Sequence, residues 1–141
     1  MNDDALGVML IDDDEVDVMS VKRAFKQLNI TNPLYVAGNG MEALAMLRGG
    51  SDQPAVPRPL IILLDLNMPR MNGIEFLKTL RADPGLGSLT VVVLTTSNED
   101  RDKVDAFKLN VAGYIVKPVT PSRFVEAMMT LDKYWTLSEI V

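Results

Sequence analysis

Five short apolar runs, separated by segments with a different periodicity, constrain the fold of this chain more than any other feature. Each run is rich in Val, Ile and Leu and nearly continuous in apolar character, as is typical of parallel strands that helices cover on both faces. The segments between them place apolar residues at helical spacing. The runs cover residues 6–11, 34–37, 60–64, 90–94 and 112–116. This alternation predicts an α/β fold.

Start and stop signals predict five helices in the intervening segments. We expect the first from about Asp14, the second after Gly40, the third from Asn72-Gly73, the fourth from Ser97 or Asn98, and the last from Pro121 to about Leu137. Helical spacing directs a set of apolar side chains into the core, among them Ile74, Leu77 and Leu80 in the third helix and Val104 and Phe107 in the fourth.

The strands should form one sheet in the order 2-1-3-4-5. Crossovers between parallel strands are right-handed, and the switch point of such a sheet lies beside the first strand. The chain has 141 residues, the length of one globular domain, and contains no repeat or linker. We therefore expect residues 1–141 to form a single domain with a doubly wound five-stranded parallel sheet.

Composition excludes several kinds of chemistry. The chain has no Cys and no His, which rules out disulfides, thiolate nucleophiles and a phosphohistidine donor. Its formal charge is -5, and it has no basic run, so direct nucleic-acid binding is not expected. It also lacks an apolar stretch of about 20 residues, and the start MNDDAL is acidic. We expect a cytoplasmic protein that does not insert into membranes.

Polar residues follow the ends of four of the apolar runs. Asp12 and Asp13 come after the first run, Asp65 after the third, Thr95 after the fourth and Lys117 after the fifth. In doubly wound sheets, ligands bind beyond the carboxyl ends of the strands at the switch point. We therefore expect these side chains to converge on one rim.

Each of these residues also has a plain structural interpretation. The acidic run 12–14 can be a solvated helix cap, Asp65 a turn residue, Thr95 a strand residue and Lys117 a surface charge. If they do converge, about three like charges lie together, which raises at least one pKa unless a cation compensates. Mg²⁺ prefers such oxygen ligands. Beside it, Asp65 could attack phosphorus, and Thr95 and Lys117 could bind the phosphoryl oxygens.

Four motifs resemble the signatures of bacterial two-component response regulator receiver domains, which are CheY-like. They are LIDD at residues 10–13, LDLNMPRMNG at 64–73, LT at 94–95 and GYIVKP at 113–118. The resemblance covers residues 6 to 137 in order and spacing. It implies the flavodoxin-like (βα)5 form of the predicted sheet.

The resemblance also implies roles for the residues at the rim. Asp12 and Asp13 would be the acidic pair that binds Mg²⁺, with Asp65 and the backbone carbonyl of Asn67 as further ligands. Asp65 would accept a phosphoryl group from a sensor histidine kinase. The protein would then be a signalling phospho-acceptor that catalyses only its own phosphorylation and dephosphorylation.

Three further positions match this family. Thr95 and Lys117 would bind the phosphoryl group, and the Lys117-Pro118 peptide would be cis. Tyr114 would be the aromatic residue that moves with Thr95 on activation. These roles are implied by the resemblance and do not follow from periodicity.

A narrower resemblance is to single-domain regulators paired with bacteriophytochrome-type sensor kinases. It rests on the loop at 49–59, on residues 63–67 and 94–97, and on Lys133-Tyr134-Trp135. The chain departs from many of them in having Asp12 where Glu is frequent. This narrower resemblance implies that the partner is a phytochrome-like histidine kinase.

The output would be a protein contact or phosphate traffic, because no residues remain after the last helix for a DNA-binding domain. The apolar stripe of Phe124, Met128, Leu131 and Trp135 is either core or, at its end, a contact surface. A homodimer through the fourth helix, fifth strand and fifth helix is one candidate arrangement. A kinase contact is the other.

Two other functional classes are compatible with parts of the pattern. A Mg²⁺-dependent phosphatase with an Asp nucleophile would need a cap, for which the chain has no spare length. A flavodoxin-like cofactor binder would need a phosphate loop after the first strand. There, the acidic residues Asp12 to Glu15 would repel the phosphate.

Overall fold

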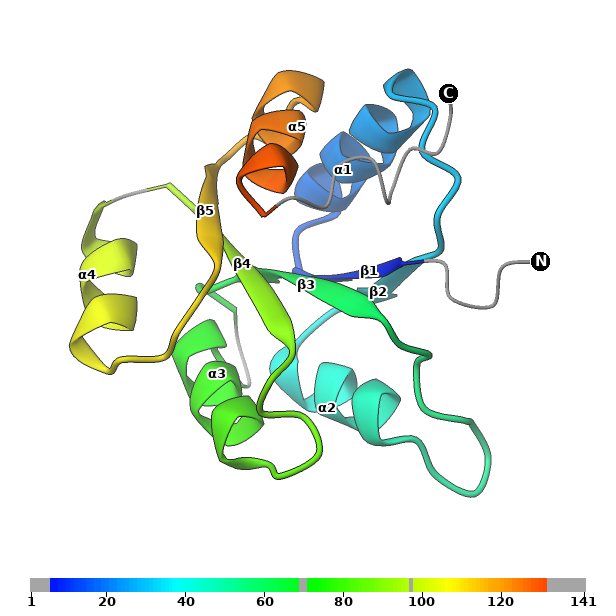
Figure 1. Ribbon diagram of the computed structural model, residues 1–141, viewed down its shortest axis with the longest axis vertical. Helices are drawn as coiled ribbons and strands as arrows, with labels where there is room; N and C mark the ends of the chain where they lie inside the picture. The colour runs from blue at the N-terminus through cyan, green and yellow to red at the C-terminus, as the bar shows by residue number, and fades with distance from the viewer. Residues whose placement is uncertain (1–5, 69–70, 97, 132–141) are drawn as a thin grey trace.

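The computed structural model describes residues 6–68, 71–96 and 98–131, in which five strands and five helices alternate. The strands are β1 (Gly7–Ile11), β2 (Leu34–Ala37), β3 (Leu60–Asp65), β4 (Thr90–Thr95) and β5 (Gly113–Val116). The helices are α1 (Glu15–Gln27), α2 (Gly40–Arg48), α3 (Gly73–Ala82), α4 (Asn98–Ala106) and α5 (Pro121–Thr130). Figure 1 shows the helices on both sides of the central sheet.

The sheet has the predicted order, β2-β1-β3-β4-β5, and its neighbouring strands are all parallel. Its register aligns the strand ends: Ile11 pairs with Leu64, and Asp65 pairs with Leu94. Because the strands are parallel and their carboxyl ends are aligned, the residues that follow them meet at one rim of the sheet. The doubly wound flavodoxin-like fold is confirmed.

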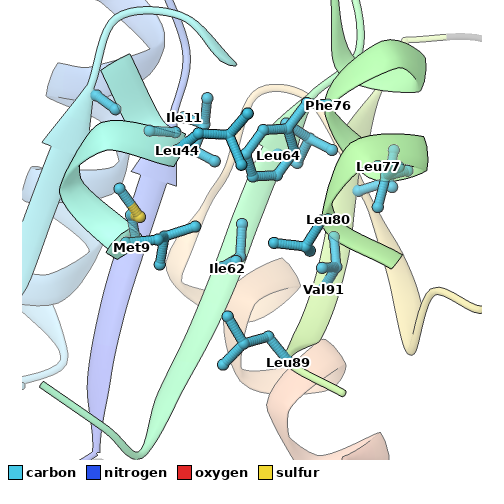
Figure 2. Close-up of a cluster of buried hydrophobic side chains, with 14 of the residues drawn as sticks. Met9, Ile11, Leu44, Ile62, Leu64, Phe76, Leu77, Leu80, Leu89 and Val91 are labelled. Atoms are coloured by element: carbon cyan, nitrogen blue, oxygen red, sulfur yellow. The ribbon is translucent and has the colours of Figure 1, made fainter. Parts of the chain in front are cut away.

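Helices α1 and α5 cover one face of the sheet, and α2, α3 and α4 lie on the other (Figure 1). Alternate residues of the same strands point to opposite faces, which produces two apolar clusters. Figure 2 shows the cluster beneath α2 and α3, in which Met9, Ile62 and Leu64 of the sheet face Phe76 and Leu80. Burial on both faces explains why the strands are continuously apolar.

Side-chain caps set the helix starts. Asp14 Oδ1 accepts from the Val16 N–H at 2.8 Å, and Asn72 forms a capping box with Glu75. The starts predicted near Asp14, Asn72-Gly73 and Pro121 are confirmed. The second helix begins at Gly40, one residue earlier than expected, because Asn39 caps it.

The prediction that Phe107 faces the core is wrong. Helix α4 ends at Ala106, and Phe107 is 50% exposed, with its ring centroid 3.7 Å from Lys78 Nζ. Val104 is buried as predicted. In α3, Leu77 and Leu80 are buried as predicted, whereas Ile74 is only partly buried and Phe76, which was not predicted, is fully buried.

Two predicted boundaries concern residues outside the described ranges. Ser97, one of two expected caps of α4, is among them, and α4 already includes Asn98. The expected end of the last helix at Leu137 is also outside them, and α5 is described to Thr130. In the described ranges, no helix is both long and apolar enough to cross a bilayer.

Gly73 permits the close contact between the start of α3 and the end of β3. A Cβ atom there would lie 2.5 Å from Leu66 Cα and 2.8 Å from the Asp65 carbonyl oxygen. The Gly73 N–H also donates to the Leu66 carbonyl at 2.9 Å. The absence of a side chain at Gly73 therefore permits the close turn of the loop that follows Asp65.

We expect Gly73→Ala to destabilise the protein by roughly 1–3 kcal/mol, because backbone atoms that cannot move aside occupy the position of the new methyl group. Urea unfolding would measure the change. Gly50→Ala is the matched control, since nothing lies within 4 Å of a Cβ at that exposed position. Equal stability of the two variants would contradict the role assigned to Gly73.

Candidate functional site

Three charged side chains from different strand ends meet at the carboxyl rim. Asp12 follows β1, Asp65 ends β3 and Lys117 follows β5. Lys117 Nζ lies 3.4 Å from Asp12 Oδ2 and 3.2 Å from Asp65 Oδ1. Asp12 and Asp65 are only 2% and 4% exposed. The predicted convergence of these three residues is therefore present.

Asp17 is a fourth member of this cluster and was not predicted from the sequence. Its Oδ2 lies 2.6 Å from Lys117 Nζ, the shortest of the ion pairs of that lysine. Carboxylate oxygens of Asp12, Asp17 and Asp65 all lie within 4.8 Å of one another. Helical spacing could have revealed it, because Asp17 shares the stripe of Val21 at the end of α1 nearest the rim.

Asp13 and Asn67 border this group. The Asp13 side chain is exposed and lines a cavity of about 540 Å³, together with Asp17, Asp65 and Asn67. The Asn67 N–H donates to Asp65 Oδ1 at 3.3 Å. The predicted metal-binding roles of Asp13 and of the Asn67 carbonyl stay predictions.

Thr95 lies on the same rim, at the end of β4, and is buried. Its hydroxyl donates to Asp100 Oδ2 in the first turn of α4 at 2.9 Å. Tyr114 of β5 is partly buried, and its hydroxyl donates to Asp105 Oδ1 at 3.5 Å. The Lys117-Pro118 peptide is cis, as the resemblance implied.

Burial and mutual repulsion disturb the ionisation of this cluster. Burial raises the pKa of Asp12 to about 7, against the opposing hydrogen bond from the Asp14 N–H. Burial also raises the pKa of Asp65, although Lys117 opposes the shift. Burial alone would lower the pKa of Lys117, but the hydrogen bond to Asp17 and the charges of Asp12 and Asp65 outweigh it and raise that pKa.

The cluster has the properties of a site for a hard divalent cation. When all three carboxylates are ionised, Lys117 leaves a local charge of about -2, by simple counting of unit charges. Asp12 Oδ2 is buried and accepts no hydrogen bond from the described residues, and its contact with Lys117 Nζ at 3.4 Å is an ion pair only. A buried carboxylate oxygen without a hydrogen bond is costly, and a divalent cation would offset that cost. The residues present therefore fit such an ion.

The chain is similar to a known protein family and to known proteins over most of its length. The family model for the response regulator receiver domain matches residues 8–129. The chain is 30% identical over 128 residues to Response regulator Rcp1 of Synechocystis sp., a match that covers 91% of this chain and 87% of that protein.

Solved structures of similar proteins include two bacteriophytochrome response regulators. RtBRR is 36% identical with a TM-score of 0.80, covering 89% of this chain and 76% of that one. AtBRR is 31% identical with a TM-score of 0.82, covering 95% and 97%. The Mn²⁺-bound form of Rcp1 is 30% identical with a TM-score of 0.72, covering 96% of each chain. A divalent ion thus binds to that similar protein.

We expect Asp12 to make the metal-free protein less stable as pH rises from about 4 to about 7. Its pKa is raised on folding, from 3.8 to about 7, so the folded state retains a proton that the unfolded state releases. This contribution is complete below pH 3.8 and is lost as pH rises through 7. Its slope is at most about 1.4 kcal/mol per pH unit.

Urea unfolding in EDTA at several pH values would measure this slope. Asp12→Asn should remove it, whereas Asp52→Asn in the exposed loop 49–59 should retain it. A wild-type pH profile parallel to that of Asp12→Asn would show that Asp12 does not hold the proton.

Proposed function

Since the chain belongs to the response regulator receiver domain family, we propose that it accepts a phosphoryl group on Asp65 from a sensor histidine kinase. Receiver domains are signalling phospho-acceptors of two-component systems and are not conventional enzymes. The observation that carries the proposal is the placement of Asp65 between Lys117 and two further carboxylates at the rim of the sheet.

Asp65 has the surroundings that a nucleophilic carboxylate needs. An Asp65 oxygen would form the new bond to phosphorus, and the bond from phosphorus to the kinase's histidine nitrogen would break. Asp65 lines the cavity through which the donor would approach. Lys117 Nζ and the Asn67 N–H orient the Asp65 carboxylate, and the ammonium group offsets the charge that develops on the phosphoryl oxygens.

We propose Mg²⁺ as the ion that the acidic cluster holds. Asp12, Asp13 and Asp65 would supply carboxylate oxygens and Asn67 its backbone carbonyl, and Asp17 is an additional candidate ligand. The ion would neutralise carboxylate charge and stabilise charge on the phosphoryl oxygens. Thr95 and Lys117 would contact the other phosphoryl oxygens from β4 and β5.

The similarity to bacteriophytochrome response regulators supports a phytochrome-like histidine kinase as the partner. We propose that residues 1–141 act as a single receiver domain, which signals through protein contacts or serves as a phosphate sink for the kinase. Val116 on β5 is 46% exposed, and Met129 on α5 is also exposed. These apolar side chains support a homodimer or kinase contact through α4, β5 and α5.

Asp65→Asn should abolish labelling by a small phosphodonor such as acetyl phosphate, because the amide oxygen is a poor nucleophile. Intact-protein mass spectrometry with Mg²⁺ would detect the added phosphoryl group, and peptide mapping would locate it. Asp52→Asn is the control and should label as the wild type does. Undiminished labelling of Asp65→Asn would contradict the assignment of the acceptor.

The metal ligands can be separated by two neighbouring substitutions. Mg²⁺ at about 100 times its Kd should stabilise the wild type by about 2.7 kcal/mol, because the ion binds only the folded state. Asp13→Asn should reduce this gain more than Asp14→Asn, since Asp14 caps α1 and Asn preserves that cap.

Thermal unfolding with and without Mg²⁺ would measure both effects. A larger loss in Asp14→Asn would show that Asp14, and not Asp13, contacts the ion. An unchanged Tm of the wild type in Mg²⁺ would contradict the metal site as a whole.

A further inference from the structure

Asp100 is a buried carboxylate that the phosphorylation chemistry does not use. It is 4% exposed and lies in the first turn of α4, where it accepts a hydrogen bond from the Thr95 hydroxyl at 2.9 Å. Thr95 is itself buried. A buried carboxylate needs donors to offset its lost hydration, so this contact matters more than a surface hydrogen bond.

The Thr95 hydroxyl cannot serve both Asp100 and a phosphoryl group. A hydroxyl carries one hydrogen, and in this structure it points to Asp100. Phosphoryl oxygens are acceptors and would need that same hydrogen. The contact with Asp100 and a contact with phosphorylated Asp65 therefore exclude each other.

Asp100 is one of only two buried side chains in α4. The other is Val104, and the rest of the helix is mostly charged. If Thr95 turned toward Asp65, Asp100 would lose this donor while still buried. The straightforward relief is for the start of α4 to move and expose Asp100 to water.

Movement of α4 would reach Tyr114 directly. The Arg101 guanidinium lies over the Tyr114 ring at 4.7 Å, and the Tyr114 hydroxyl donates to Asp105 Oδ1. Both partners belong to α4, which lies beside β5 at the edge of the molecule (Figure 1). Displacement of the helix would remove two restraints from Tyr114.

We propose that Asp100 is a positioning residue that holds Thr95 in its resting orientation. Through this contact it couples phosphorylation of Asp65 to the position of α4 against the sheet. The proposal rests on the proposed function, since it concerns the phosphorylated state. Asp100 opposes phosphorylation, because the bond to Thr95 must break first. Loss of Asp100 should therefore favour the phosphorylated state while it loosens α4.

The test compares Asp100→Ala with Asp102→Ala, a substitution at an exposed position of the same helix. With Mg²⁺ and beryllofluoride as the phosphoryl mimic, titration calorimetry should show roughly tenfold tighter binding of the mimic to Asp100→Ala, the ratio for about 1.4 kcal/mol. Asp100→Asn keeps an acceptor and should be intermediate. Asp102→Ala should match the wild type.

A double substitution identifies the partner of Asp100. Thr95→Val has no hydroxyl to donate, so adding Asp100→Ala to it should change the affinity for the mimic less than twofold. A tenfold gain in that background as well would overturn the proposal, because Asp100 would then act without Thr95.

Hydrogen exchange of α4 amides supplies a second readout, and its comparison of variants needs neither metal nor phosphoryl mimic. Amides of residues 98–106 should exchange faster in Asp100→Ala than in Asp102→Ala without any ligand, and the mimic should accelerate them in the wild type. A merely structural Asp100 would lower the Tm without tightening mimic binding, and that result would overturn the proposal.

Failure of the proposed function would give a different result. The wild type would then neither bind the mimic nor become labelled on Asp65, and the proposal about Asp100 would fail with it.

Discussion

The ion pairs of Lys117 are the interaction on which the site depends. One ammonium group contacts carboxylates from three separate segments, those of Asp12, Asp17 and Asp65. Without it, three negative charges would lie together in a largely buried place. Burial is the main reason that the pKa of Asp12 and that of Asp65 are raised, and Lys117 only partly opposes the shifts. One lysine also leaves the charge of three carboxylates unbalanced. The same imbalance makes the site receptive to a divalent cation.

The apolar layers on both faces of the sheet hold in place the strands that carry these charged residues. Both faces of the sheet are packed with aliphatic side chains, so β1, β3 and β4 are held in register almost to their ends. The charged cluster sits beyond that packing, where the strands stop. At the same end, Gly73 allows the loop after Asp65 to turn closely into α3. The core therefore fixes the site without having to include its charges.

Helices α3 and α4 are anchored to the rest of the protein to different degrees. Helix α3 buries three apolar residues and Gly73, and its Arg81 donates to four backbone carbonyls in the loops before β4 and β5. Helix α4 has one buried aliphatic side chain, Val104, and one buried carboxylate, Asp100. An element anchored so lightly can respond to a change at Thr95, whereas α3 cannot do so without breaking the core.

The sequence by itself determined the strands, their order and the convergence of Asp12, Asp65 and Lys117, because apolar runs define strands and parallel strands end at one rim. Only the tertiary structure decided which neighbours these residues have. Helical spacing places Asp17 on the inward stripe of α1, but its contact with Lys117 joins residues 100 positions apart, and spacing within one helix does not specify that partner. Helical spacing predicted a buried Phe107, but α4 ends at Ala106 and Phe107 is exposed. The burial of Asp100 was not predicted at all, because it depends on how α4 packs against the sheet, which periodicity does not encode.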